Sequence, residues 1–360
     1  MTLKQILEHE DLSALLFNAC TPGTLCSIRR LCKKYRPFLE RFFDTKFNIH
    51  NRLLRFFTSP DAFRAMQRDT LTLISGSFAL QFFAGILYPD SDLDLYVEHL
   101  FAQQVVDFLL TDGYRFQPTA AQLGLQETLK VTQFASPEPY GTSDIEGIGG
   151  VLTFKKDNGQ TVQLIVTCQG KTAIEVILNF HSTVVMNFIA WDLACSLYPA
   201  ATFERNMSLA CRVTPESHPI DSLMKYRRRG WNVILPEENT SSDLQSLLVS
   251  PFGGDNLRWV GDCKTWLIRL PTNNLPLLPP QPAMSCNLIL HPACSTWWSL
   301  MLHDGMVSVE YSKFISRVRF LEYVRKHRPR QQEYLSNHEF FDSDYFMGTA
   351  KYLEDLSMDS

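Results

Sequence analysis

The chain has 360 residues, of which 45% are hydrophobic and 20% charged, a composition typical of a globular protein that can bury a core. The length favours one to three domains. The formal net charge of −4 argues against a general nucleic-acid binder, which usually carries a basic excess.

The expected compartment follows from the cysteines and from the apolar segments. Nine cysteines occur without any C-x-x-C pair, which indicates reduced, buried thiols rather than a zinc site. The N-terminus mixes acids and bases early and is not a secretory signal. The most apolar run, residues 184–198, is interrupted by Asn187 and Asp192 and cannot span a bilayer. We therefore expect a cytoplasmic or nuclear protein that does not enter a membrane.

The first part of the chain, residues 1–58, is predicted to be helical. Segment 2–17 carries apolar residues at helical spacing. Thr21 and Pro22 fit the N-cap and the first position of a further helix that runs to Phe43. This region is treated as a helical N-terminal segment.

Strands alternate with helices in the next region, residues 59–200, which we interpret as one α+β domain. A hairpin turn is expected at Asp157-Asn158-Gly159. Thr172 and Glu175 fit a capping box. The expected elements are a strand over 70–75, a helix over 78–88, a strand over 92–98, a helix over 100–114, strands over 150–156 and 160–167, and a helix over 173–198.

Residues 201–360 are expected to form a C-terminal α/β extension. A helix over 219–229 should end at Gly230, followed by a short strand. Two β segments are expected around Gly261 and Asp262, and the tail from Ser312 onward should be helical. Nothing in this region identifies a substrate.

Several polar groups are explained without catalysis. Basic clusters at 29–36, 225–229 and 325–330 fit solvated helix faces and helix ends better than phosphate or partner contacts. His181 and Ser182 are adjacent, and adjacent residues of a helix point about 100° apart, so they do not form a nucleophile and base pair.

A pair of acids and a Gly-Ser dipeptide are the residues that indicate a chemical function. Asp92 and Asp94 lie two residues apart in a predicted strand, so both side chains point to one face. Two such carboxylates repel unless a cation lies between them, and Mg²⁺ suits them when substrate phosphates complete its octahedron. Gly76 and Ser77 stand where a strand meets a helix, whose N–H groups and dipole favour a phosphate. This combination is typical of metal-assisted phosphoryl or nucleotidyl transfer.

An EF-hand does not explain these acids. A calcium loop that started at Asp90 would need Gly at its sixth position and Glu at its twelfth, where the chain has Leu95 and Phe101. Asp90 alone is best explained as a turn residue.

Residues 73–97 resemble the signature of the nucleotidyltransferase fold superfamily, in which Gly-Ser at a helix start is followed by an acid-x-acid strand. The resemblance covers about a third of the chain and implies a mixed β-sheet flanked by helices. It also implies an NTP bound with Mg²⁺ or Mn²⁺, and transfer of a nucleoside monophosphate to a hydroxyl or phosphate acceptor. Gly76 and Ser77 would then bind the nucleotide, and Asp92 and Asp94 would be the catalytic metal ligands.

One position departs from this pattern. Active members of the superfamily usually carry a third carboxylate on a following strand, and the matching strand here, 161–167, has Gln163 at that position. Glutamine cannot ionise and is a poor Mg²⁺ ligand, while the nearby Glu175 is explained by its capping box. Two interpretations stay open, namely a Mg²⁺-dependent nucleotidyltransferase and a catalytically inactive scaffold.

Residues 1–45 weakly resemble an F-box, with a short acidic helix, a break and then the segment "LCSIRRLCKKYRPFL". The usual Leu-Pro opening is replaced by Leu7-Glu8-His9-Glu10. The resemblance implies binding of a Skp1-like adaptor through an apolar helical surface. The alternative is a helical cap that packs on the chain's own domain.

Overall fold

The computed structural model describes residues 2–31, 33–89, 91–133, 145–212, 220–253, 257–275, 296–303 and 305–313. The predicted turn residue Asp90 and the predicted helical tail beyond Lys313 lie outside the described residues. The described part contains helices α1 (Leu3–Glu8), α2 (Glu10–Asn18), α3 (Pro22–Leu31), α4 (Arg36–Lys46), α5 (Ile49–Leu53), α6 (Pro60–Thr70), α7 (Gly76–Ala84), α8 (Ala102–Thr111), α9 (Leu125–Gln133), α10 (Ala173–Leu178), α11 (Ile220–Arg228) and α12 (Ser241–Val249). None of the helices in these ranges combines the length and the apolarity needed to cross a membrane.

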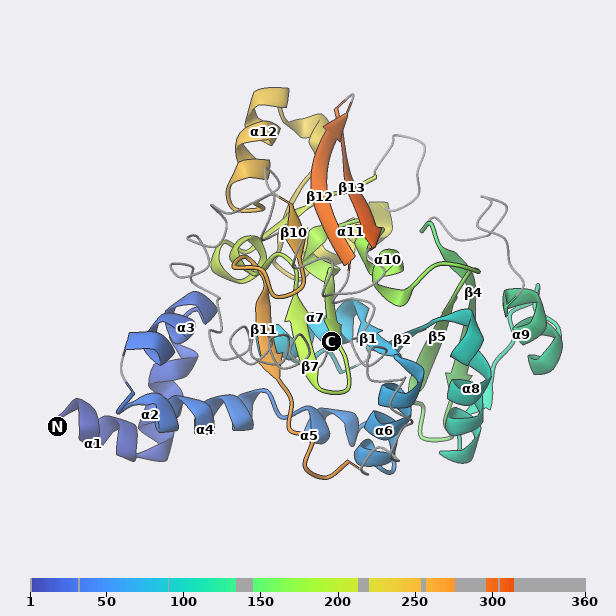
Figure 1. Cartoon of the computed structure of the whole chain (residues 1–360), viewed down its shortest axis with the longest axis horizontal. Coiled ribbons are helices and arrows are strands. Elements are labelled where there is room, and N and C mark those ends of the chain that lie inside the picture. Colours follow the sequence, from blue (N-terminus) through green and yellow to red (C-terminus); the bar gives the residue numbers. More distant parts are fainter. Residues whose placement is uncertain are drawn as a thin grey trace, which may run out of the picture.

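The strands form one large and two small sheets (Figure 1). They are β1 (Leu73–Ser75), β2 (Leu93–Val97), β3 (Arg115–Phe116), β4 (Ile148–Lys155), β5 (Thr161–Thr167), β6 (Asn187–Ile189), β7 (Leu193–Ser196), β8 (Met207–Leu209), β9 (Asn232–Ile234), β10 (Arg258–Trp259), β11 (Trp266–Arg269), β12 (Thr296–His303) and β13 (Met306–Lys313). The large sheet has the order β11-β7-β6-β1-β2-β5-β4-β3. Its β2–β5 pair is parallel and its other pairs are antiparallel. The predicted class, α+β with a mixed sheet flanked by helices, is confirmed.

Alternation along β2 and β5 divides the core between the two faces of the large sheet. Leu93, Leu95, Val162 and Leu164 pack on one face with α5, α6, α7 and α8. Tyr96 and its neighbours pack on the other face with α10 and α11. Since side chains of a strand alternate between faces, Asp92 and Asp94 share the face of Tyr96, as the strand pattern predicted.

The predicted long helix over 173–198 is wrong. The capping box does open a helix, but α10 ends at Leu178, and β6 and β7 then form a hairpin within the large sheet. The hairpin closes with a hydrogen bond from Ala190 N–H to the carbonyl of Leu193, at 2.7 Å. Every residue of both strands is buried. A strand covered on both faces is a continuous apolar run, and over a short span its sequence cannot be distinguished from a buried helix.

Two other predicted helices also change. The helix expected from Pro22 to Phe43 is two helices, α3 and α4, and Pro37 lies in the first turn of α4, where its missing N–H costs nothing. Ser312 and Lys313 are not helical, because they pair with Trp297 and Thr296 in the β12–β13 hairpin.

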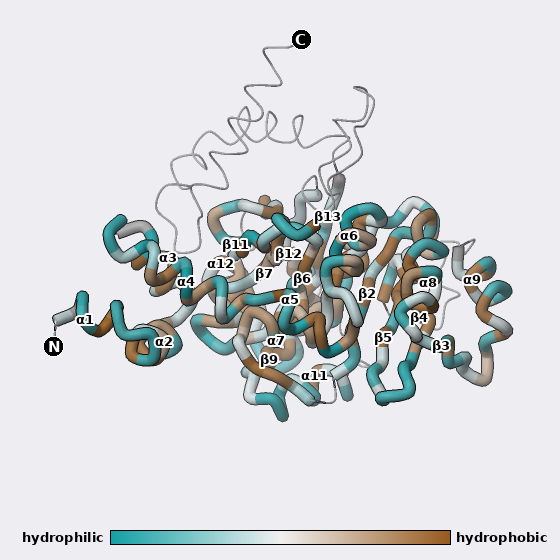
Figure 2. Tube along the Cα trace, turned by 90° about the horizontal axis from the view of Figure 1, so that it is seen from below, coloured by the Kyte–Doolittle hydropathy of each residue, from teal (hydrophilic) through white to brown (hydrophobic). Residues whose placement is uncertain are grey.

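The first four helices form an arm beside the large sheet (Figures 1 and 2). They share a small apolar cluster of their own, made by Leu7, Phe17, Leu25, Leu39 and Phe42. The next helices, α5 and α6, belong instead to the core on one face of the sheet. At the other end of the chain, β11 adds an edge strand to the same sheet.

Candidate functional site

The predicted phosphate cradle lies where β1 runs into α7. Gly76 has φ +63°, a left-handed conformation that suits glycine, and begins the nine-residue helix. The N-cap residue Ser75 makes no capping bond, because its hydroxyl donates to the carbonyl of Asn187 at 2.5 Å. The first N–H groups of α7 therefore lack a side-chain cap and suit an anion. The hydroxyl of Ser77 has no hydrogen-bond partner among the described residues.

The acid pair lies directly against this helix start. Asp94 is paired with Ser75 across β1 and β2. A Cβ built on Gly76 would overlap Asp94 Oδ2 and would lie 3.2 Å from its Cγ, so only glycine permits this approach. Asp92 precedes β2 and, like Asp94, is half-buried. The structure thus brings Gly76, Ser77, Asp92 and Asp94 together.

The electrostatics of the acid pair favour an added positive charge. Burial and, to a smaller extent, the charge of Asp92 raise the pKa of Asp94 to about 7, although the charge of Lys225 acts to lower it. A raised pKa means that the surroundings of a carboxylate stabilise its ionised form poorly. A cation between the two carboxylates would remove that penalty.

Gln163 occupies the position next to the acid pair. It is the register partner of Asp94 on the parallel strand β5, and its Nε2 donates to Asp92 Oδ2 at 3.4 Å. Within the described ranges, no group of three or more His, Cys, Asp or Glu side chains is placed to hold a metal ion. Among the described residues, a metal here would therefore have two protein carboxylates as ligands, those of Asp92 and Asp94.

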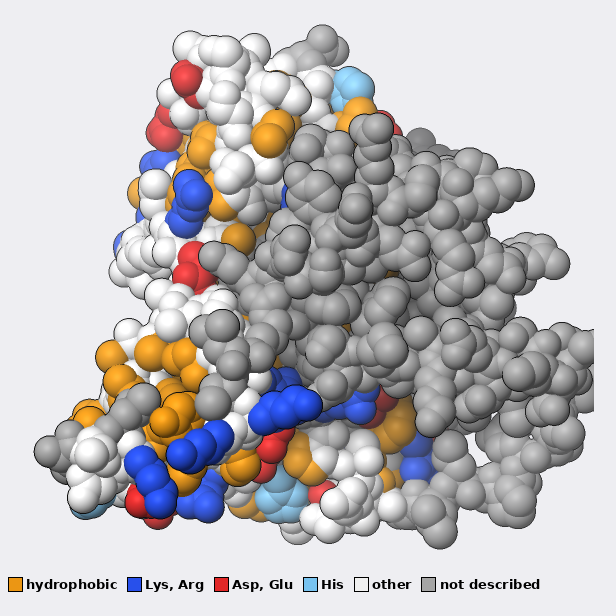
Figure 3. Space-filling view, turned by 60° about the vertical axis from the view of Figure 1, so that its left-hand side comes forward, with side chains coloured by type: hydrophobic (Ala, Val, Ile, Leu, Met, Phe, Trp, Pro, Cys, Tyr) orange, Lys and Arg blue, Asp and Glu red, His pale blue; other side chains and the backbone are white. Residues whose placement is uncertain are grey.

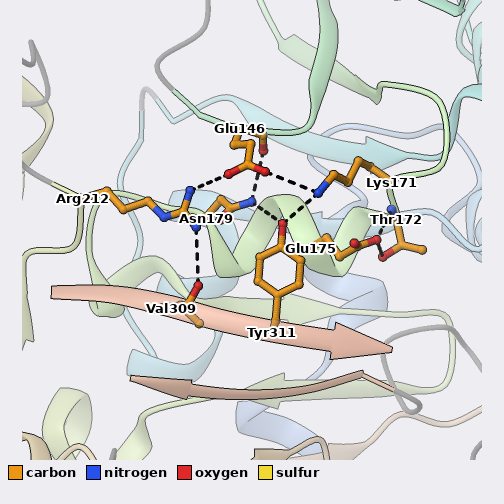
Figure 4. A network of polar contacts seen from close by, with 8 residues as sticks. All are labelled: Glu146, Lys171, Thr172, Glu175, Asn179, Arg212, Val309 and Tyr311. Atoms are coloured by element: carbon orange, nitrogen blue, oxygen red, sulfur yellow. Dashed lines mark hydrogen bonds and ion pairs between the residues drawn. The ribbon is translucent and has the colours of Figure 1, made fainter. Parts of the chain in front are cut away.

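Glu175 does not replace the missing carboxylate. Its Oε2 accepts the N–H and the hydroxyl of Thr172, both at 2.8 Å, as the capping box predicted. Figure 4 shows the surrounding network, in which Tyr311 of β13 accepts from Lys171 at 3.2 Å and from Asn179 at 2.9 Å. This network joins α10 to the β12–β13 hairpin and serves the packing of the fold.

Helix α11 brings basic residues to the acid pair, which the sequence did not reveal. The charges of Asp94 and Asp92 both raise the pKa of Lys225, against the stronger effects of partial burial and of Arg229, which lower it. Lys225 forms no direct ion pair with either acid in the described part of the chain. The cluster at 225–229 was expected on a solvated helix end, and Lys225 is exposed there, although its charge also acts on the two acids.

Three buried polar atoms without hydrogen-bond partners among the described residues lie at the C-terminal end of helix α11 or on side chains that contact that end. The guanidinium of Arg229 stacks 3.8 Å from the ring centre of Tyr88. Arg229 Nη1, Tyr88 Oη and His181 Nε2 are all buried without a hydrogen-bond partner among the described residues. Burial and the charge of Lys225 lower the pKa of His181 to about 4, so His181 is neutral near pH 7. These three groups lie far apart in the sequence, which left no local signal for them.

The donor set fits Mg²⁺ or Mn²⁺ in the way these ions usually bind nucleotides. Mg²⁺ commonly takes one or two protein carboxylates and fills its other positions with phosphate oxygens and water. Asp92 and Asp94 provide two carboxylates, and the start of α7 provides N–H groups for phosphate beside them. The site fits a metal bound together with its phosphate better than a metal held by protein alone.

The first prediction concerns Asp94 and pH in the presence of EDTA. Because the pKa of Asp94 is about 7 in the folded protein and near 3.8 in the unfolded chain, stability should fall as pH rises from about 4 to 7. Asp94→Asn should remove this loss and raise the free energy of unfolding above pH 7 by roughly 2 kcal/mol, less than the full shift implies because Asp94 is partly exposed. Urea unfolding at pH 4.5 and 8 measures the difference, and a gain of equal size at both pH values would contradict it. Asp92→Asn is the control, and it should make the fall smaller and end it at lower pH, because the charge of Asp92 no longer raises the pKa of Asp94.

Comparisons with known proteins add little to this geometry. No protein-family model matches the chain, and no curated protein sequence matches it. Among solved structures, it is similar to one titled "The structure of CCA-adding enzyme apo form I", with 13% identity and a TM-score of 0.31. The match covers 57% of this chain and 45% of that chain, so this chain spans less than half of the other's length. A similarity this low carries no argument about function.

Proposed function

We propose that the protein is nucleotidyltransferase-like and binds a nucleoside triphosphate together with Mg²⁺ or Mn²⁺ at the start of α7. The observation that carries this proposal is the packing of the Asp94 carboxylate on Gly76. It sets a metal ligand beside uncapped helix N–H groups, so that one site can hold both a cation and the phosphates bound to it.

Each group has a separate task in this proposal. Asp92 and Asp94 hold the metal, which when bound neutralises phosphate charge and polarises the phosphoryl group. The hydroxyl of Ser77 and the first N–H groups of α7 donate to phosphate oxygens. The charges of both acids act to raise the pKa of Lys225, although Lys225 forms no direct ion pair with them among the described residues. In this proposal Lys225 adds positive charge for the outer phosphates.

Gln163 favours binding over rapid transfer. An amide beside Asp92 can donate a hydrogen bond but cannot accept the proton of an acceptor hydroxyl. Loss of a general base typically costs a factor of about 10² to 10⁴ in rate. We therefore propose a metal-dependent nucleotide binder in which transfer is slow or absent, with the acceptor and the base unassigned.

The second prediction tests binding by calorimetric titration of ATP, CTP, GTP and UTP with and without Mg²⁺. At least one nucleotide should bind the wild type only with Mg²⁺. Asp92→Asn and Asp94→Asn should each weaken that binding about 30- to 100-fold, since each removes a charged metal ligand without changing shape. Asp157→Asn, at an exposed turn, is the control and should bind as the wild type does. Binding that ignores both Mg²⁺ and the two substitutions would reject the site.

Release of pyrophosphate in the same samples separates the two interpretations. Metal-dependent binding without pyrophosphate supports the inactive scaffold. If the wild type releases pyrophosphate and Asp94→Asn does not, the protein is a transferase. In that case, the absence of a carboxylate at Gln163 does not prevent transfer.

A second candidate function concerns helix α2. Leu15 and Leu16 on this helix are 67% and 39% exposed, although the helix packs its Phe17 in the arm's core. Figure 3 shows hydrophobic side chains bordered by Lys and Arg on this face. Large exposed apolar side chains are common at protein interfaces, and the proposed partner is a Skp1-like adaptor.

The third prediction tests this with purified adaptor by surface plasmon resonance. Leu15→Asp should weaken binding by at least tenfold, because it places a charge in the apolar contact. Leu110→Asp, at a comparably exposed leucine of α8, is the control and should leave binding unchanged. If the wild-type chain does not bind the adaptor, the alternative is favoured, in which residues 1–45 form a helical cap that packs on the chain's own domain.

A further inference from the structure

The segment between α7 and β2 is held from outside by two arginines of the N-terminal helical region. Arg55 Nη1 donates to the carbonyl of Tyr88 at 3.2 Å, and its Nη2 donates to the carbonyl of Ser91 at 3.3 Å and also to that of Pro89. Arg52 Nη1 donates to the carbonyl of Ile86 at 3.1 Å. The planar guanidinium of Arg55 can bond several carbonyls at once because its donors are fixed in a fork.

The same segment is held from inside by a glutamine of α7. Gln81 is 2% exposed, and its Nε2 donates to the Ser91 hydroxyl and to the Ser77 carbonyl, both at 3.0 Å. Its Oε1 accepts the N–H of Tyr88 at 2.5 Å. The segment is therefore fixed on both sides, and Gln81 links it to the helix start at which the phosphate would bind.

The position of these bonds matters more than their number. The Ser91 carbonyl belongs to the peptide group whose nitrogen is that of Asp92. A donor on that carbonyl fixes the orientation of this peptide plane, since the peptide group is rigid. Arg55 therefore acts on the backbone immediately before the first acid of the pair, whereas Arg52 acts at the far end of the segment.

We propose that Arg55 is a positioning residue for the metal site, which holds the backbone before Asp92 so that Asp92 and Asp94 face one cation. This inference rests on the proposed function, because it assigns the acids to a metal. Residues that orient metal ligands without touching the metal typically contribute a factor of about 10 to 100 in affinity. Arg55 has this role while lying on a different part of the chain from the acids.

The experiment compares Mn²⁺ binding to the full chain, measured from the electron paramagnetic resonance signal of free Mn²⁺. Arg55→Met keeps the apolar stem beside the Phe56 ring and removes the donors. It should raise the Kd for Mn²⁺ about tenfold. Arg52→Met is the matched control and should change Kd by less than about threefold. Arg55→Lys, a point charge without the fork, should lie between the wild type and Arg55→Met.

A general loss of stability would not produce this pattern. A variant that loses only a small part of the stability of a natural domain remains almost entirely folded, so its Kd for Mn²⁺ would hardly move. Urea unfolding of each variant checks that condition. A Kd for Arg55→Met within twofold of the wild type would overturn the positioning role.

Amide hydrogen exchange distinguishes this failure from failure of the proposed function. The N–H of Ser91, which bonds the Tyr88 carbonyl at 3.2 Å, should exchange faster in Arg55→Met than in Arg52→Met without any metal. Wild-type protein that binds no Mn²⁺, either alone or together with ATP once the Mn²⁺ held by ATP itself is subtracted, would reject the metal site and the positioning role with it. If the wild type binds no Mn²⁺ and Ser91 N–H also exchanges at the same rate in Arg55→Met and Arg52→Met, the conclusion that Arg55 fixes this segment would be rejected as well.

Discussion

Gly76→Ala is expected to lower the free energy of unfolding by about 2 kcal/mol and to weaken Mg²⁺-dependent nucleotide binding by at least about tenfold. Two separate penalties add at this position. The backbone has φ +63°, where alanine costs about 1 kcal/mol more than glycine. The new Cβ would also overlap Asp94 Oδ2 and push the carboxylate away from the helix start. Urea unfolding and calorimetric titration measure the two effects.

Gly113 provides a matched control for this change. It also has a left-handed backbone, with φ +90°, but a Cβ there would meet nothing within 4 Å. Gly113→Ala should therefore show only the backbone penalty and leave nucleotide binding intact. If the contact with Asp94 matters, Gly76→Ala should cost less stability in an Asp94→Ala background, and equal costs in both backgrounds would refute the close approach.

Arg258→Met should destabilise the fold by about 3–5 kcal/mol, the largest effect we expect on stability. Arg258 and Asp262 are 1% and 4% exposed and form a buried ion pair at 2.5 Å. Arg258 also donates to the carbonyls of Leu197 at 2.9 Å and Phe252 at 3.1 Å. Removing the guanidinium leaves the Asp262 carboxylate buried without its cation, which is far more costly than losing an exposed pair.

Urea unfolding followed by tryptophan fluorescence measures this loss. Arg115→Met breaks the exposed Arg115–Asp157 pair, with side chains 72% and 81% exposed, and should cost less than about 1 kcal/mol. The double variant Arg258→Met/Asp262→Asn should lose less than the sum of its single changes, because no unpaired charge remains. A loss for Arg258→Met no larger than that for Arg115→Met would show that the pair does not stabilise the fold.

The region around the acid pair could be predicted because its signals are local. Alternating apolar residues placed β2 and β5, and the turn at Asp157-Asn158-Gly159 joined β4 to β5. Strand alternation then put Gln163 on the face of the acids, where the structure has it paired with Asp94. Each of these inferences uses a spacing of a few residues, which the backbone geometry fixes directly.

The hairpin of β6 and β7 was missed because the same apolar run suits two structures. A strand buried on both faces shows no alternation, so only its neighbours in the sheet distinguish it from a helix. Ile189 pairs with Ile74 of β1, more than 100 residues earlier, and such a contact has no counterpart in the local sequence.

The sequence by itself determined the α+β class, the junction of a strand and a helix at Gly76 and Ser77, and the shared face of the acids and Gln163, whereas the helix expected over 78–88 is α7, Gly76–Ala84. The tertiary structure alone decided which distant charges act near that place, namely Lys225, whose charge interacts with those of the acids, and Arg55, which donates to the carbonyl of Ser91. The physical reason is the sequence distance over which each kind of interaction acts. Secondary structure depends on residues a few positions apart, whereas the electrostatic environment of a carboxylate depends on whatever the whole fold packs around it.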